Sequence, residues 1–125
     1  MNKVAYYAHS VHLYDTEQEK RDIALLESLG FKVFNPNQEY IQKDIEELRA
    51  KSSDSIMSYF DSIIDKCDIV AFRAHLDGKI PSGVGYEIKY AQKEGKPIFE
   101  LPLLFENRFL SRDETKEYLK LLGNR

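Results

Sequence analysis

The chain has 125 residues, of which 42% are hydrophobic and 31% charged, and its formal net charge is −3. This length suffices for one domain that buries most of its apolar surface, and the composition is that of a globular protein rather than a disordered one. The negative charge argues against a nucleic-acid duplex as the main partner, because phosphate backbones are usually bound by basic faces. A small nucleotide remains compatible with it, since backbone amides can hold one phosphate.

The expected compartment is the cytoplasm. Cys67 is the only cysteine, so no disulfide can form within the chain, which suits a reducing environment. The first residues, MNKVAYYAHS, are too short and too polar for a signal peptide. No run approaches the ~20 apolar residues of a membrane span. We therefore expect a single domain over residues 1–125 that has no membrane contact.

The first third of the chain is typical of a strand–helix–strand unit. Lys3–Ala8 (KVAYYA) is rich in aromatic and branched side chains and predicts a strand. A helix is predicted over Thr16–Gly30, because it opens with the capping-box spacing TEQE and ends at a glycine that can take a left-handed conformation. Phe31–Pro36 predicts a second strand. The connection is long enough for a crossover, so the two strands are expected to be parallel.

The rest of the chain continues the alternation of strands and helices. Helices are predicted over 37–53, 54–66, 84–94 and 111–123, and strands over 68–74 and 97–105, the last with a candidate break at Pro102. The run DIVAFRA is apolar on both faces, as a central parallel strand requires. The expected fold is a doubly wound α/β domain of the flavodoxin or Rossmann-like kind, with a parallel sheet of four or five strands in the order 2-1-3-4.

Ligands of such sheets bind beyond the carboxyl ends of the strands. The candidate ligand surface therefore comprises His9 and Ser10 after the first strand, Asn35 after the second and residues 74–85 after the third. Within the last segment, PSGVGYE predicts a helix that begins near Gly83 and turns the free amides of its first turn toward the crevice. Glu87 would lie in that first turn. It either serves the crevice or only complements the helix dipole, and spacing alone favours the dipole.

A family resemblance changes that weighting. CDIVAF followed by SGVGYEIKYAQKEGKPIFEL resembles the signature of the nucleoside 2-deoxyribosyltransferase-like superfamily, and PSGVGYE is especially similar to its 2-deoxynucleoside 5-monophosphate N-glycosidases. The match covers Cys67–Leu101, about a quarter of the chain. In that family a glutamate attacks the anomeric carbon of a 2-deoxynucleoside and forms a covalent glycosyl-enzyme, which water or a second base resolves. The resemblance places Glu87 at this nucleophile position. Tyr6 is either the family's pocket tyrosine on strand one or an ordinary strand aromatic.

Two family positions are offset here by one residue. The family's acid is an aspartate eight residues before the aspartate that opens the third strand, a place that Phe60 occupies here, followed by Asp61. A slip of one residue rotates a helical side chain by ~100°. The family's sugar- or phosphate-binding residue six positions before the nucleophile is likewise offset, from Pro81 to Ser82. The expected catalytic residues are Glu87 and Asp61, and the expected substrate-binding residues are Tyr6, His9, Ser10, Ser82, Gly83 and Gly85.

The resemblance implies an N-glycosidase or a 2-deoxyribosyltransferase that acts on a deoxynucleoside or its monophosphate. The alternative is a binding module on the same fold that holds a nucleotide or a nucleotide signal without chemistry, and a third possibility is an oligomeric scaffold with an unused crevice. An acid that faces the pocket opposite Glu87 would favour hydrolysis, so Asp61 separates the first two. Neither a cofactor nor a metal is expected, since the three histidines have no completing ligand at a recognised spacing.

The resemblance also implies a homodimer or a larger assembly. Family members pack the helix that follows the glycine turn against a partner chain. Four aromatic residues are candidates for such a face, namely Tyr86, Tyr90, Phe105 and Phe109.

Overall fold

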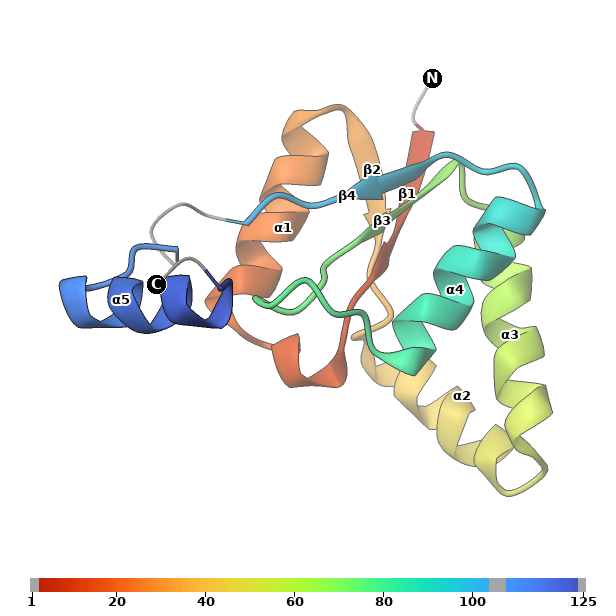
Figure 1. The fold of residues 1–125 in the computed structure, drawn as a ribbon. Helices are drawn as coiled ribbons and strands as arrows, with labels where there is room; N and C mark the ends of the chain where they lie inside the picture. Colours follow the sequence, from red (N-terminus) through yellow and green to blue (C-terminus); the bar gives the residue numbers. More distant parts are fainter. Residues whose placement is uncertain (1–2, 104–107, 124–125) are drawn as a thin grey trace.

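Four parallel strands lie side by side in the order β2-β1-β3-β4 in the computed structural model, which describes residues 3–103 and 108–123 (Figure 1). The strands are β1 (Lys3–Ala8), β2 (Phe31–Phe34), β3 (Ile69–Phe72) and β4 (Ile98–Glu100). The predicted fold class and strand order are confirmed. Because β1 lies between β2 and β3, the point where the strand order reverses is at the middle of the sheet.

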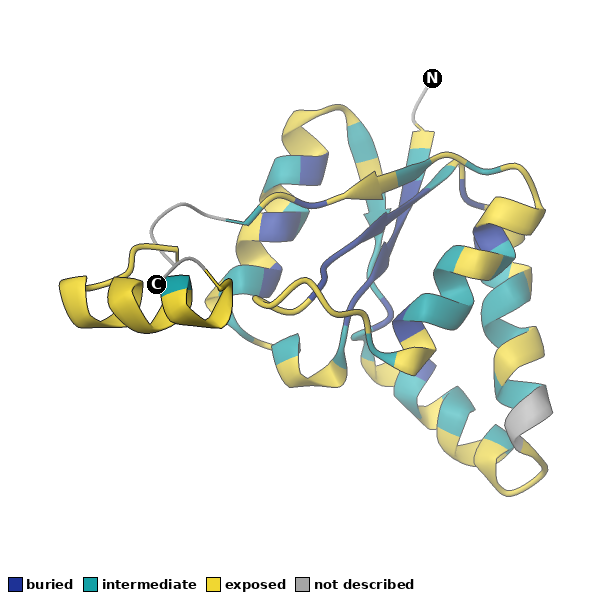
Figure 2. Ribbon diagram, in the orientation of Figure 1, coloured by how far each residue is buried: buried dark blue, intermediate teal, exposed yellow. Residues whose placement is uncertain are grey.

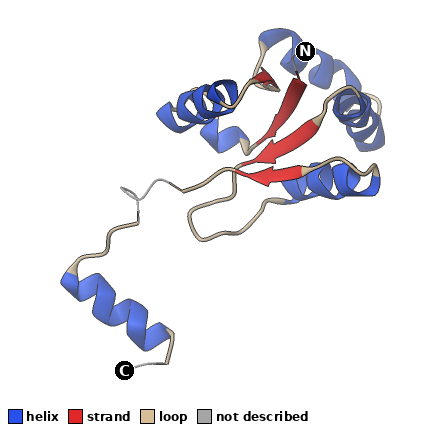
Figure 3. Ribbon diagram, turned by 90° about the horizontal axis from the view of Figure 1, so that it is seen from above, coloured by secondary structure: helices blue, strands red, loops and turns tan. Residues whose placement is uncertain are grey.

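Helices cover both faces of this sheet (Figure 3). They are α1 (Glu17–Ser28), α2 (Glu39–Arg49), α3 (Ser53–Asp65), α4 (Ser82–Lys93) and α5 (Arg112–Leu121). The helix α1 packs on one face, α3 and α4 pack on the other, and α2 lies against α3. A short 3₁₀ helix, η1 (Val11–Leu13), which the sequence analysis did not anticipate, follows β1. The helix α5 stands apart from the sheet (Figures 1 and 3).

Most predicted boundaries lie within a few residues of the observed ones. Thr16 caps α1 by accepting the Glu19 amide at 3.2 Å, and Gly30 takes a φ of +96° behind the helix, as predicted. The fourth strand is shorter than predicted, and residues 104–105 of that prediction lie outside the described residues. None of the helices in the described ranges is both long and apolar enough to span a membrane.

Alternation along β1 divides the interior into two clusters, because successive strand side chains point to opposite faces. Tyr6 and Ala8 pack toward α3 and α4, and Ala5 and Tyr7 pack toward α1. All four side chains are fully buried. The strand therefore holds two adjacent tyrosines rigidly, with their hydroxyls on opposite sides of the sheet.

The α1 face contains a buried ion pair. Asp22 and Arg73 are 1% and 4% exposed. The Arg73 guanidinium donates to both oxygens of the Asp22 carboxylate, and its Nη1 donates to the carbonyl oxygen of Pro102 at 2.8 Å. The Tyr7 hydroxyl donates to Asp22 Oδ2 at 2.5 Å. Each charge thus has an opposite charge and further hydrogen bonds, the condition under which burial of ions is tolerated.

Removing one member of this pair should destabilise the fold strongly. The Asp22→Ala variant leaves the Arg73 charge buried without its partner, so we expect urea unfolding to report a loss of about 3–5 kcal/mol in the free energy of unfolding. The control is Glu17→Ala on the same helix, whose carboxylate pairs with the exposed Lys20 at 3.5 Å. That pair should contribute less than about 1 kcal/mol. Equal, small losses in the two variants would contradict the structural role of the buried pair.

Candidate active site

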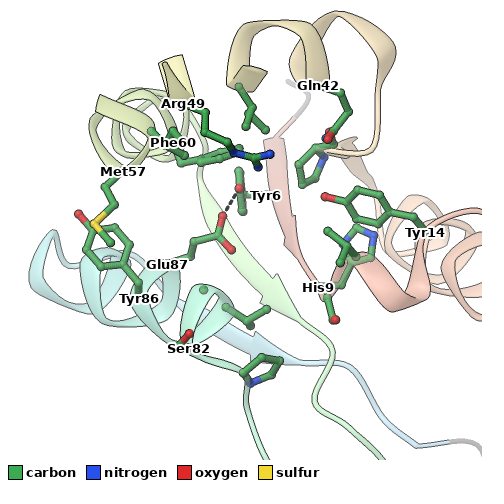
Figure 4. A pocket seen from close by; sticks show the side chains of 18 residues that line it. Tyr6, His9, Tyr14, Gln42, Arg49, Met57, Phe60, Ser82, Tyr86 and Glu87 are labelled. Atoms are coloured by element: carbon green, nitrogen blue, oxygen red, sulfur yellow. Dashed lines mark hydrogen bonds between the residues drawn. The ribbon is translucent and has the colours of Figure 1, made fainter. Parts of the chain in front are cut away.

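A pocket of about 560 Å³ opens beyond the carboxyl end of β1, next to the start of α4 (Figure 4). Side chains from β1, η1, α2, α3 and α4 and from the loops around them line it. The volume lies in the range of small-molecule sites, and the place is where a doubly wound sheet binds its ligands. Six of the predicted site residues line it, namely Tyr6, His9, Ser10, Ser82, Gly83 and Glu87.

The floor of the pocket contains a hydrogen bond between two groups that are 81 residues apart in sequence. The Tyr6 hydroxyl, on the central strand, donates to Glu87 Oε2, on α4 (Figure 4). Tyr6 is fully buried, whereas Glu87 is partly exposed to the pocket. Tyr6 therefore fixes the Oε2 atom of the Glu87 carboxylate, and the Oε1 atom takes no part in this hydrogen bond.

Burial dominates the electrostatics of this pair. It raises the pKa of Glu87 from 4.5 to about 7, the Tyr6 hydrogen bond lowers that pKa, and the negative charge of Asp61 raises it. Burial, followed by the charge of Glu87, holds the pKa of Tyr6 well above its ordinary value of 10. Tyr6 thus keeps its proton near neutral pH and remains a donor. Glu87 changes charge in the range where enzymes commonly operate.

His9 forms a fixed wall of the pocket. Its Nε2 lies 2.8 Å from Glu19 Oε2, its Nδ1 lies 3.1 Å from the carbonyl oxygen of Tyr7, and its ring stacks on the Tyr7 ring with centroids 3.7 Å apart. The carboxylate of Glu19 also accepts from Asn37 and from the amide of Asp15. The spacing TEQE suggested a reciprocal capping box, but this carboxylate turns to His9 instead. Only the Thr16 half of the box forms.

The helix α4 begins at Ser82, one residue before the start expected near Gly83 and two before the predicted range 84–94. Glu87 therefore lies in its second turn rather than its first. Gly85 does not line the pocket, and its amide donates to the Pro81 carbonyl oxygen at 2.8 Å. The first-turn amides, those of Ser82 and Gly83 among them, lack intrahelical acceptors. A Cβ atom on Gly83 would meet no heavy atom within 4 Å, so there is open space beside this backbone.

Asp61 is turned away from the pocket, whose wall at this place is Phe60. Its Oδ2 accepts a hydrogen bond from the Tyr86 hydroxyl at 2.9 Å, and its Oδ1 is buried without a hydrogen-bond partner among the described residues. Tyr86 lines the pocket and therefore lies between Asp61 and the cavity. Of the carboxylates that the structure describes, Glu87 alone lines the pocket.

Sequence reasoning missed the wall that α2, α3 and η1 supply. Gln42, Ile45 and Arg49 line the pocket from one face of α2, at the spacing i, i+3, i+7. Burial, and after it the charge of Glu87, raises the pKa of Tyr14 in the same wall to about 12. The helical period could have indicated this wall, because it places Gln42 and Arg49 on the same face of α2 as Ile45. Asn35, expected at this surface, instead accepts the Asn37 amide at 2.9 Å in the turn before α2.

A metal centre finds no support in the described part of the chain. No group of three or more His, Cys, Asp or Glu residues there is arranged to hold an ion. Of the three histidines, His9 lines the pocket and its ring is engaged by Glu19.

No protein-family model and no curated protein matches this chain. Among solved structures, it is similar to a 2-deoxyribosyltransferase from Leishmania mexicana, with a TM-score of 0.54 and 17% identity over 79% of this chain. The chain spans 63% of that protein. It is also similar to a CMP N-glycosidase from Clostridium botulinum, with a TM-score of 0.48 and 20% identity, over 95% of this chain and 99% of that one. The chain thus has the fold of a 2-deoxyribosyltransferase, and the predicted resemblance is confirmed at the level of the fold.

The titration of Glu87 tests the description of the site. With glutamate labelled at its carboxyl carbon, NMR should show one carboxyl with a midpoint near 7, absent in Glu87→Gln. The Tyr6→Phe variant removes a hydrogen bond that stabilises the ionised form, so the midpoint should move to higher pH. Tyr90→Phe is the control, because that α4 hydroxyl bonds to Asp65 at the surface. A Glu87 midpoint near 4.5 that does not change in Tyr6→Phe would show that the hydrogen bond between Tyr6 and Glu87 does not form.

Proposed function

We propose that the pocket cleaves the N-glycosidic bond of a deoxynucleoside or a deoxynucleoside monophosphate, by hydrolysis or by transfer of the sugar to a second base. The observation that carries this function is the hydrogen bond between Tyr6 and Glu87 at the pocket floor. The family resemblance assigns a role to both residues, and the shared fold of a 2-deoxyribosyltransferase supports the same chemistry.

Glu87 is the proposed nucleophile. Tyr6 holds Oε2, so that Oε1 attacks the anomeric carbon and forms an ester bond to the sugar. The bond from that carbon to the base nitrogen breaks, and its electron pair leaves with the base, which takes up a proton. Water or a second base then attacks the same carbon and frees the carboxylate. A pKa of about 7 leaves a substantial ionised fraction at neutral pH on a carboxylate that is poorly solvated.

The start of α4 is the proposed site for sugar hydroxyls or a phosphate. The Ser82 hydroxyl and the free amides of the first turn border the pocket, with the positive end of the helix dipole behind them. Gly83 leaves room for a ligand beside the backbone. His9 and Ser10 close the opposite wall. The Gly85 amide, which is already bonded to Pro81, is not part of this site.

Asp61 keeps a proposed catalytic role by acting through Tyr86. Tyr86 lines the pocket, and its hydroxyl donates to the Asp61 carboxylate, so Asp61 holds this side chain in place beside the bound substrate. Asp61 is then a positioning residue without substrate contact. The second candidate function, nucleotide binding without chemistry, is favoured by the fact that Glu87 is the one carboxylate among the described lining residues.

Replacing Glu87 should separate binding from chemistry. We expect the wild type to release base from at least one member of a panel of deoxynucleosides and their monophosphates. Glu87→Gln keeps the shape and removes the attacking charge, so turnover should fall by about a thousandfold or more while thermal shift still reports binding. Glu94→Gln, an exposed change at the end of the same helix, is the control and should turn over normally.

Two results would contradict this function in different ways. Undiminished base release by Glu87→Gln would refute the nucleophile. A thermal shift with nucleotides, together with no base release from any panel member by the wild type, would favour the binding module.

The proposed assembly is a homodimer or a larger oligomer. Apolar side chains are exposed on and around α5, which stands apart from the sheet (Figure 2); they are Phe109, Leu110, Tyr118, Leu121 and Leu122. Tyr86 and Tyr90 are bound to Asp61 and Asp65 within the chain, and Phe105 lies outside the described residues. These observations support an interface that is centred on α5 rather than on α4.

Light scattering tests this assembly. The wild type should have at least twice the mass of one chain at micromolar concentration, and Leu121→Glu should weaken the association because it places a charge in the apolar contact. Lys116→Glu, a charge change on the same helix, is the control. A mass of one chain at every concentration would exclude the oligomer.

A further inference from the structure

Arg49 is a cationic group of the pocket that the proposed chemistry does not use. It lies at the end of α2, and its guanidinium extends over the cavity on the far side of Glu87 from Ser82 (Figure 4). It forms no ion pair with any carboxylate whose side chain the structure describes. A guanidinium has only donors, so its hydrogen-bonding capacity at this place is available to a ligand with acceptors.

The walls around Arg49 are apolar. Ile45 of α2 and three residues of α3, namely Ile56, Met57 and Phe60, also line the pocket, and Phe60 lies beside Arg49 (Figure 4). At the opposite end, the polar start of α4 suits hydroxyls or a phosphate. The pocket therefore has a polar end and an apolar end with a single cation, and Glu87 lies between them (Figure 4). A nucleoside is divided in the same way, because its polar sugar and its flat base lie on either side of the anomeric carbon.

We propose that Arg49 binds the edge of the nucleobase and selects bases that present an oxo group there, such as hypoxanthine or uracil, over bases that present an amino group, such as adenine or cytosine. The selection rests on the proposed function, because it is the attack by Glu87 that places the anomeric carbon between the two ends. A guanidinium N–H donates to the exocyclic oxygen of either oxo base, and in hypoxanthine a second N–H can donate to N7 beside that oxygen. An exocyclic amino group would instead direct its own N–H donors at the guanidinium, and the donors of both groups would then lack acceptors.

A phosphate is the other acceptor-bearing group that a guanidinium binds well. The surroundings favour the base. The walls of Ile45, Met57 and Phe60 suit a flat, weakly polar ring and offer a doubly charged group no further donors. The first-turn amides of α4 provide an anion site at the other end of the pocket.

The test compares substrates that differ only in the exocyclic group. The kcat/KM ratios of 2′-deoxyinosine to 2′-deoxyadenosine and of 2′-deoxyuridine to 2′-deoxycytidine are measured for the wild type, Arg49→Gln, Arg49→Lys and Arg21→Gln. We expect the wild type to favour the oxo member by about tenfold or more in the pair that it accepts. Arg49→Gln should bring the ratio near one, and Arg49→Lys should fall between, because a lysine lacks the planar fork. Arg21, exposed on α1, is the matched control and should leave the ratio unchanged.

Equilibrium binding separates this inference from the proposed function. The same nucleoside pairs are titrated onto Glu87→Gln with and without Arg49→Gln, which needs no turnover. If the wild type cleaves nothing but the oxo member binds more tightly in an Arg49-dependent way, the proposed function fails and base selection by Arg49 stands. Base preference that survives Arg49→Gln overturns the inference. So does a variant that loses only the preference for monophosphates over nucleosides, since Arg49 would then be a phosphate ligand.

Discussion

The hydrogen bond from the Tyr6 hydroxyl to the Glu87 carboxylate is the interaction on which the pocket depends. It joins the central strand of the sheet to the second turn of α4, and it partly offsets the cost of holding a carboxylate in a poorly solvated place. Burial raises the pKa of Glu87 and the donor lowers it, so the balance between the two sets the fraction of the carboxylate that is ionised at neutral pH. Without the donor, the same burial would favour the uncharged acid.

The two adjacent tyrosines of β1 have different roles, because their side chains lie on opposite faces of the sheet. Tyr6 points toward α4 and reaches the pocket, whereas Tyr7 points toward α1 and joins the buried pair of Asp22 and Arg73. The Tyr7 ring also supports His9 by stacking. The scaffold and the site are thus continuous through one strand, an arrangement that holds functional groups on rigid elements.

Strand–helix alternation and the apolar third strand were sufficient to predict the class and the strand order, because parallel strands with crossovers leave few arrangements. They also predicted His9 at the carboxyl edge of the sheet, whereas Tyr6 and Glu87 were expected at the site from the family resemblance. The orientation of Asp61 could not be predicted, since a helical residue changes direction by ~100° per position and only the packing of α3 fixes its rotation. Arg49 was missed for a related reason, because the sequence does not show how α2 packs against α3. The start of α4 depends on Pro81, which takes the extended conformation of an N-cap.

The central claim is that Glu87 forms a covalent bond to the sugar. The most direct measurement is the mass of the protein after incubation with a 2-fluoro-arabinosyl analogue of a nucleoside that it cleaves, because the fluorine slows the breakdown of a glycosyl-enzyme ester. We expect a gain of one fluorinated sugar unit, located by peptide mapping on the segment that contains Glu87. Release of base with no change in protein mass, or an adduct on another residue, would contradict it.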